Sequence, residues 1–238
     1  MRLNRYNELA SAVDANNEGA GSPALRKRGG IITVHGINTI GKWQDDVSTW
    51  IQDAGYLCSR VTYGRILFTS PFPFALSKAL DRVEERYNEL RRRALDVSVI
   101  AHSFGSLTVG NLLFRKPSIK FRRMVLYGSV LSPRFPWRDC AANGQVHEIL
   151  HEIGGRDVWP WFAPVGFLLQ KQSGWSGVRG FRNPPPCMTE LFHSGSGHSD
   201  LQSEEHFKSV WIPFLVHGPA AVRHLRASLK AAKKRRRR

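Results

Sequence analysis

The sequence predicts an α/β fold in which a mainly parallel sheet carries helices on both faces. Short apolar runs typical of buried strands alternate along the chain with segments whose apolar residues recur at helical spacing. One run, residues 97–102, is followed by a serine with a small residue two positions before it and another two positions after it, and then by an amphipathic segment. This pattern is typical of a strand, a sharp turn and a helix. The chain has 238 residues, of which 42% are hydrophobic. One substantial core is therefore expected, and a second domain is unnecessary.

The predicted elements follow one another in the order that a parallel sheet requires. Strands are expected at residues 31–35, 57–63, 97–102, 124–130, 146–152 and 188–192. Helices are expected at residues 43–54, 75–93, 104–115 and 203–216. The polar segment 1–29 is expected to be flexible, residues 30–230 to form the folded domain, and residues 231–238 to form a polybasic tail.

Ser103 lies at the apex of the turn predicted after the strand 97–102. A turn tight enough to lift a serine hydroxyl clear of the sheet crowds the positions two residues away, and these are Ala101 and Gly105. The same turn places the amide of Phe104 in the first turn of the following helix, where backbone N–H groups can stabilise an oxyanion. Ser103 is therefore the candidate nucleophile, and the alternative is a serine that merely caps the helix.

A second apolar run, residues 31–34, ends in His35-Gly36-Ile37. This V-H-G-I motif, together with A-H-S-F-G at residues 101–105, resembles the α/β-hydrolase superfamily, and most of all its small bacterial lipases and esterases. The resemblance implies the α/β-hydrolase fold and an oxyanion hole formed by the amides of Ile37 and Phe104. No long insertion resembles a large cap domain, so a compact version of the fold is expected.

The resemblance also implies a triad in the chain order serine, acid, histidine. Asp157 follows the predicted strand 146–152 after a short Gly-Gly-Arg loop, and it is the expected acid. Asp139 is the alternative, because some members of the superfamily place the acid after the preceding strand.

The expected catalytic histidine is His198, in the sequence Gly-His-Ser-Asp, which resembles the histidine loop of the superfamily. It would take the serine proton and pass it to the leaving group, while the acid holds its tautomer. His193, at the end of the last predicted strand, is the alternative base. Asp200 is too close to His198 in sequence to be its acid.

Two aromatic segments are candidate walls of a substrate pocket. Residues 158–169 directly follow the expected acid and are rich in Trp and Phe, which form rigid apolar surfaces at low entropic cost. Residues 68–74 are a second candidate. The alternative is that the first segment is an irregular cover over the core.

The net charge of the chain is +16, and the six basic residues 233–238 form its C-terminal end. Basic residues also gather at 26–28, 91–93 and 115–123. Such a tail could be held nonspecifically by the phosphate groups of an anionic membrane or of nucleic acid, or it could be a solvated end. No motif that reads DNA or RNA sequence is present, and no obligate partner is evident.

The three cysteines, Cys58, Cys140 and Cys187, lack the spacing of a disulfide framework or a zinc site, which is typical of a reducing compartment. The N-terminus has no apolar signal segment, and no apolar run is long enough for a membrane span. We therefore expect a cytoplasmic protein. No cofactor and no metal is expected.

These features together predict a serine hydrolase that cleaves a carboxylic ester or thioester, of a small molecule or a lipid, through an acyl-enzyme. Ser103, His198 and Asp157 would form the triad. The alternative is a noncatalytic binding or signalling module that retains the fold and uses its basic surface and tail.

Overall fold

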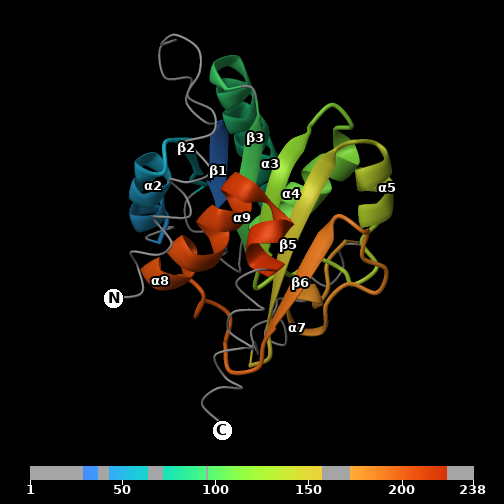
Figure 1. Cartoon of the computed structure of the whole chain (residues 1–238). Helices are drawn as coiled ribbons and strands as arrows, with labels where there is room; N and C mark the ends of the chain where they lie inside the picture. The colour runs from blue at the N-terminus through green and yellow to red at the C-terminus, as the bar shows by residue number, and fades with distance from the viewer. Residues whose placement is uncertain (1–28, 37–42, 64–71, 95, 157–171, 224–238) are drawn as a thin grey trace, which may run out of the picture.

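The structure is a computed structural model that describes residues 29–36, 43–63, 72–94, 96–156 and 172–223. Within these residues the strands form one sheet in the order β2-β1-β3-β4-β5-β6, and all neighbouring strands are parallel (Figure 1). The strands are β1 (Gly30–Val34), β2 (Leu57–Val61), β3 (Val97–His102), β4 (Phe121–Tyr127), β5 (Val146–Gly154) and β6 (Met188–His193). Each of the six predicted strands is present, with bounds that differ by up to three residues, and the predicted parallel sheet is confirmed.

Helices flank the sheet in the order that the sequence predicts. They are α2 (Trp43–Asp53), α3 (Phe72–Arg93), α4 (Phe104–Arg115), α5 (Trp137–Ala142), α7 (Ser176–Arg179), α8 (Glu204–His206), the π-helix η3 (Phe207–Trp211) and α9 (Ile212–His217). The short helices α5 and α7 were not predicted. Of the candidate pocket walls, residues 68–71 and 158–169 lie outside the described residues, while 72–74 begin α3.

The segment predicted as one closing helix over 203–216 contains a change of helix type. Pro213 has no backbone N–H, so the helical hydrogen bond that this residue would donate is missing. Directly before it, the N–H of Ile212 donates to the carbonyl of Phe207, five residues back, which is the π-helical pattern. The closing segment is therefore α8, η3 and α9 in succession.

Strand β4 lies earlier in the chain than the predicted range 124–130. It begins at Phe121 because Arg123 is paired with Glu148 of β5, with 2.6 Å between Nε and Oε2, and a paired arginine can occupy a buried strand position. It ends at Tyr127, and the next residue, Gly128, has a φ of 52°, a left-handed conformation that breaks the strand.

The alternation of side chains along the strands gives the sheet two apolar faces. Ile100, Val125 and Leu150 are in register on one face, and their cluster includes residues of α2, η3 and α9. Val99, Met124 and Ile149 are in register on the other face, and their cluster includes residues of α3, α4 and α5. Both faces are therefore covered by helices, as parallel sheets require.

The register also aligns polar side chains at the carboxyl end of the sheet. His102 of β3 is paired with Tyr127 of β4, which is paired with Glu152 of β5. Residues that are directly paired across parallel strands project to the same face, so these three side chains form a row beside the end of β3. No helix in the described part of the chain is long and apolar enough to cross a membrane.

Candidate active site

Ser103 occupies a sharp turn between β3 and α4. Its φ of 54° and ψ of −121° make it the one non-glycine residue with positive φ among the described residues. Such a conformation costs about 1–3 kcal/mol and persists where the surrounding structure holds it. Here the N–H of Ser103 donates to the carbonyl of Tyr127, and its own carbonyl accepts from the hydroxyl of Ser106 at 2.6 Å.

The side chain of Ser103 does not cap α4, because no side-chain capping hydrogen bond is present at this helix start. The alternative of a simple capping serine is therefore wrong. Ser103 is only 4% exposed, because the turn after β1 packs against it. A Cβ added to Gly36 would lie 2.9 Å from the Cβ of Ser103, so a side chain at position 36 would collide with the elbow.

Position 105, two residues after Ser103, has no room for a side chain. A Cβ on Gly105 would lie 2.4 Å from the carbonyl oxygen of Val34 and 3.0 Å from that of His35. These atoms are backbone and cannot rotate away. The glycine therefore lets α4 start in contact with the end of β1.

The end of β1 is itself held in place. The ring of His35 lies 4.2 Å from that of Tyr63, whose hydroxyl donates to the His35 carbonyl, and Nδ1 of His35 is 2.7 Å from the Gly36 carbonyl. Phe104 begins α4 and is fully buried. Ile37, the other predicted oxyanion residue, lies outside the described residues.

His198 lies beside the elbow. Its carbonyl accepts a hydrogen bond from Nε2 of His102 at 3.1 Å, and the centroids of the two rings are 4.7 Å apart. A Cβ on Gly128 would lie 3.0 Å from Nδ1 of His198, so only a glycine leaves room for this ring at the end of β4. The structure thus brings the predicted base to the residues adjoining Ser103.

His102 is a site residue that the sequence did not single out, although it directly precedes Ser103. Burial, followed by the nearby His198 and His35, holds its pKa well below the usual value, so the ring is neutral. Its Nε2 carries the proton donated to His198, and the ring stacks on Tyr127 at 4.6 Å. Its buried Nδ1 has no hydrogen-bond partner in the described part of the chain. His102 therefore links the nucleophile turn to the histidine loop.

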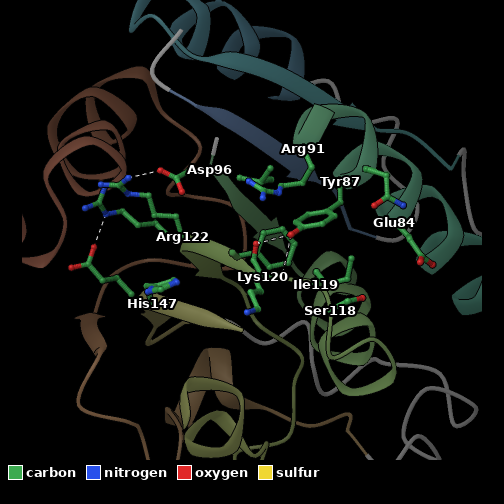
Figure 2. A pocket seen from close by; sticks show the side chains of 14 residues that line it. Glu84, Tyr87, Arg91, Asp96, Ser118, Ile119, Lys120, Arg122 and His147 are labelled. Atoms are coloured by element: carbon green, nitrogen blue, oxygen red, sulfur yellow. Dashed lines mark hydrogen bonds and ion pairs between the residues drawn. The ribbon is translucent and has the colours of Figure 1, made fainter. Parts of the chain in front are cut away.

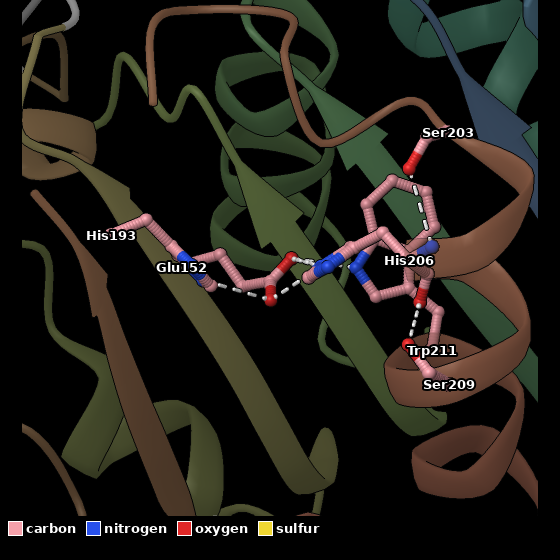
Figure 3. Close-up of polar contacts among 6 residues, drawn as sticks. All are labelled: Glu152, His193, Ser203, His206, Ser209 and Trp211. Atoms are coloured by element: carbon pink, nitrogen blue, oxygen red, sulfur yellow. Dashed lines mark hydrogen bonds and ion pairs between the residues drawn. The ribbon is translucent and has the colours of Figure 1, made fainter. Parts of the chain in front are cut away.

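His193, the alternative base, lies in a different cluster. Its Nε2 is 3.3 Å from Oε1 of Glu152, a fully buried carboxylate that the sequence reasoning missed. His206 and Trp211 contact the same carboxylate (Figure 3). Burial acts to raise the pKa of Glu152, but hydrogen bonds from these three side chains lower it to about 2.

The structure describes two of the acidic residues that the sequence analysis considered, Asp139 and Asp200. Asp139 lies on helix α5 and not in a loop directly after β4, as its candidacy assumed. Asp200 accepts a hydrogen bond from the Gly197 N–H at 2.7 Å, so its carboxylate closes the turn around His198. Asp157 lies outside the described residues, but the N–H of Arg156 donates to the carbonyl of Ser196. The backbone just before Asp157 is thus bonded to the loop that carries His198.

A pocket of about 820 Å³ lies at the opposite end of the strands, near the start of β3 and β4 (Figure 2). Several basic side chains from the predicted basic clusters line it, but Arg122 is paired with Asp96 and Arg123 with Glu148. This pocket lies at the amino ends of strands whose carboxyl ends lead to Ser103. It is therefore separate from the candidate active site.

Solved structures share this architecture. Est1E from Butyrivibrio proteoclasticus has a TM-score of 0.53 and 12% identity, over 82% of this chain and 90% of its own. A chain from the work on LipS and LipT, two metagenome-derived lipolytic enzymes, has a TM-score of 0.50 and 12% identity, over 84% and 94%. A protein of unknown function from Agrobacterium tumefaciens, described as a candidate alpha/beta hydrolase, has a TM-score of 0.50 and 14% identity, over 80% and 85%.

The chain has the α/β-hydrolase fold. A scan against protein-family models and a search of curated proteins found no match in sequence. Hydrolases of this fold carry the nucleophile in a turn between a strand and a helix, and the acid and the histidine follow it in chain order. In this chain Ser103 follows β3, Asp157 comes after β5 and His198 comes after β6.

Proposed function

We propose that the chain is a serine hydrolase that cleaves a carboxylic ester or thioester through an acyl-enzyme. The observation that carries the proposal is the backbone of Ser103, which has a positive φ at a strand-to-helix turn and is held there without capping the helix. A serine kept in a costly conformation by its surroundings is characteristic of a functional site. The packing of His198 against the same turn supports the proposal.

In the proposed reaction, Oγ of Ser103 attacks the carbonyl carbon of the substrate while His198 accepts the hydroxyl proton. The tetrahedral oxyanion is stabilised by the amides of Ile37 and Phe104, and Asp157 stabilises the imidazolium. His198 then gives the proton to the departing alcohol or thiol, which leaves the acyl group on Ser103. Water, deprotonated by His198, attacks the acyl-enzyme and releases the carboxylic acid and the free serine.

His102 has a positioning role in this proposal. Because its Nε2 donates to the backbone carbonyl of His198, it holds the histidine loop against the strand that ends at the nucleophile. Its lowered pKa keeps the ring neutral, so that it adds no positive charge next to the imidazolium that forms on His198. The solved lipolytic neighbour supports an ester substrate in a fold that hosts several chemistries.

The proposal is tested by labelling with a fluorophosphonate probe, which reacts with activated serines. The wild-type chain is expected to take up one equivalent of probe, and Ser103→Ala to take up none. The matched control is Ser118→Ala, because Ser118 is an exposed serine beside the pocket at the opposite end of the strands. Circular dichroism confirms that each variant is folded.

Labelling that persists in folded Ser103→Ala would move the nucleophile to another residue. A wild-type chain that takes up no probe would favour the noncatalytic binding module instead.

A further inference from the structure

A second group of chemically active side chains is centred on Glu152, the last member of the row His102, Tyr127 and Glu152 at the carboxyl end of the sheet. Glu152 projects from β5, His193 ends β6, and His206 ends α8 (Figure 3). The carboxylate oxygen and the two ring nitrogens that these residues offer all lie within 4.8 Å of one another. Two histidines and one carboxylate form a common ligand set for Zn²⁺.

The spacing of the ligand atoms matches a tetrahedral ion. Zinc–nitrogen and zinc–oxygen bonds of roughly 2.0–2.2 Å place neighbouring ligand atoms about 3.3–3.5 Å apart. In the structure, Nε2 of His193 is 3.3 Å and Nε2 of His206 is 2.9 Å from Oε1 of Glu152. The two ring nitrogens lie within 4.8 Å of each other, so all three atoms are close enough to converge on one ion after side-chain adjustment.

Nε2 of His206 lies 2.9 Å from Oε1 and 3.0 Å from Oε2 of Glu152, so the hydrogen bond from Trp211 is what distinguishes the two oxygens. Nε1 of Trp211 donates a hydrogen bond to Oε2 of Glu152 at 2.6 Å. A hydrogen bond to the oxygen that does not bind metal orients a ligating carboxylate and is a typical outer-shell contact. Glu152 is fully buried, whereas the side chains of His193 and His206 are 26% and 15% exposed. An ion can therefore approach from the side of the two histidines.

We propose that Glu152, His193 and His206 bind one divalent transition-metal ion, with Zn²⁺ as the best match. The three protein ligands leave a fourth position for water. The ion joins β5, β6 and α8, and so ties together both ends of the segment 194–205 that carries His198. The site does not depend on Ser103 being a nucleophile.

The competing arrangement is a buried carboxylate that is satisfied by three N–H donors and binds no ion. In that arrangement each histidine must keep a proton on Nε2. Binding of an ion at Nε2 requires that proton to move to Nδ1 or to leave to solvent. The metal site predicts tight binding of an ion that weakens when one histidine is replaced. The hydrogen-bonded carboxylate predicts no such binding.

The test uses the full chain without affinity-tag histidines, and Zn²⁺ and Co²⁺ as probes. Calorimetry and metal analysis after dialysis measure affinity and stoichiometry in the wild type, His193→Gln, His206→Gln and Glu152→Gln. His147→Gln and His217→Gln are matched controls, because both histidines are exposed and lie outside the cluster. We expect one equivalent of Zn²⁺ in the wild type and in the controls, and at least a tenfold loss of affinity in each cluster variant.

Cobalt provides a readout that does not depend on the variants folding. Intense visible d–d bands of four-coordinate Co²⁺, without thiolate charge-transfer bands, are expected for the wild type, because the ligands are nitrogen and oxygen. Equal Zn²⁺ affinity in the wild type and folded His193→Gln would overturn the proposal. Thiolate bands, or no binding at millimolar Zn²⁺, would do the same.

Discussion

Substitution of Gly105 by alanine tests how tightly the nucleophile turn is packed against β1. The added Cβ would lie 2.4 Å from the carbonyl oxygen of Val34, 2.9 Å from its carbonyl carbon and 3.0 Å from the oxygen of His35. Contacts under 3 Å with backbone atoms cannot be relieved by a side-chain rotation. The start of α4 and the end of β1 must therefore move apart.

The change that Gly105→Ala makes to the free energy of unfolding is the balance of two opposing effects. Replacing glycine by alanine inside a helix stabilises it by about 1 kcal/mol. Overpacking in a filled core costs about 1–3 kcal/mol, and here the colliding atoms belong to backbone on one side. The net loss is therefore between about 0 and 2 kcal/mol, and we expect Gly105→Ala to lower the free energy of unfolding by about 1–2 kcal/mol, since backbone atoms cannot give way. Because the separation opens at the predicted oxyanion hole, kcat for a short ester is expected to fall as well.

Urea denaturation of the wild type and of three glycine variants measures the effect. Gly195→Ala is the matched control, because a Cβ at that position meets nothing within 4 Å, and its stability is expected to stay within about 0.5 kcal/mol of the wild type. Gly110→Ala lies in the same helix but meets only side chains of Leu131 and Phe135, so a smaller loss is expected. A Gly105→Ala variant as stable as Gly195→Ala would refute the steric reasoning.

The remaining predictions concern the two histidine clusters, the acid and the tail. His198→Ala is expected to abolish short-ester hydrolysis at every pH, whereas His193→Ala lowers it only modestly; the reverse ranking in initial rates would make His193 the base. Asp157→Asn is expected to reduce kcat strongly but incompletely, because oxyanion stabilisation and substrate binding remain, and an unchanged kcat would exclude Asp157 as the acid. Folding lowers the pKa of His102, so below the ordinary pKa of about 6.5 the unfolded chain binds a proton at His102 that the folded chain does not. The free energy of unfolding therefore falls as the pH drops below about 6.5, by at most about 1.4 kcal/mol per pH unit. The unfolding free energy of His102→Gln should therefore fall less between pH 7 and pH 5 than that of the wild type, and equal falls would contradict this. Each basic residue near a charged bilayer contributes about 1 kcal/mol at most, and salt screens this attraction. Removal of residues 233–238 is therefore expected to abolish salt-sensitive binding to anionic vesicles. Short-ester turnover is expected to stay unchanged, because the proposed triad lies outside these residues. Equal vesicle binding with and without the tail would indicate a solvated end, and a tail-dependent gain on duplex DNA alone would indicate nucleic acid.

The order of the strands and helices could be predicted because it depends on local patterns. Buried strands require short apolar runs, and helices that cover a sheet require apolar residues at helical spacing. The elbow at Ser103 could also be predicted, because the steric demand for small neighbours is expressed within five consecutive residues. Boundaries were less predictable where distant partners decide them. Arg123 can lie in β4 because Glu148 of the next strand is paired with it and the carbonyls of Leu215 and Val216 accept its hydrogen bonds.

The tertiary structure alone decided which polar side chains meet. Glu152 contacts residues 41, 54 and 59 positions away in sequence, and His102 contacts the carbonyl of a residue 96 positions away. No local pattern encodes these meetings, because they depend on the strand register that aligns His102, Tyr127 and Glu152 and on the closing segment that carries His206 and Trp211 over that row. Residue types in chain order were enough to predict a nucleophile turn and a candidate base. The cluster around Glu152 required the packed sheet, since a carboxylate within an apolar strand reveals its partners only when the chain has folded around it.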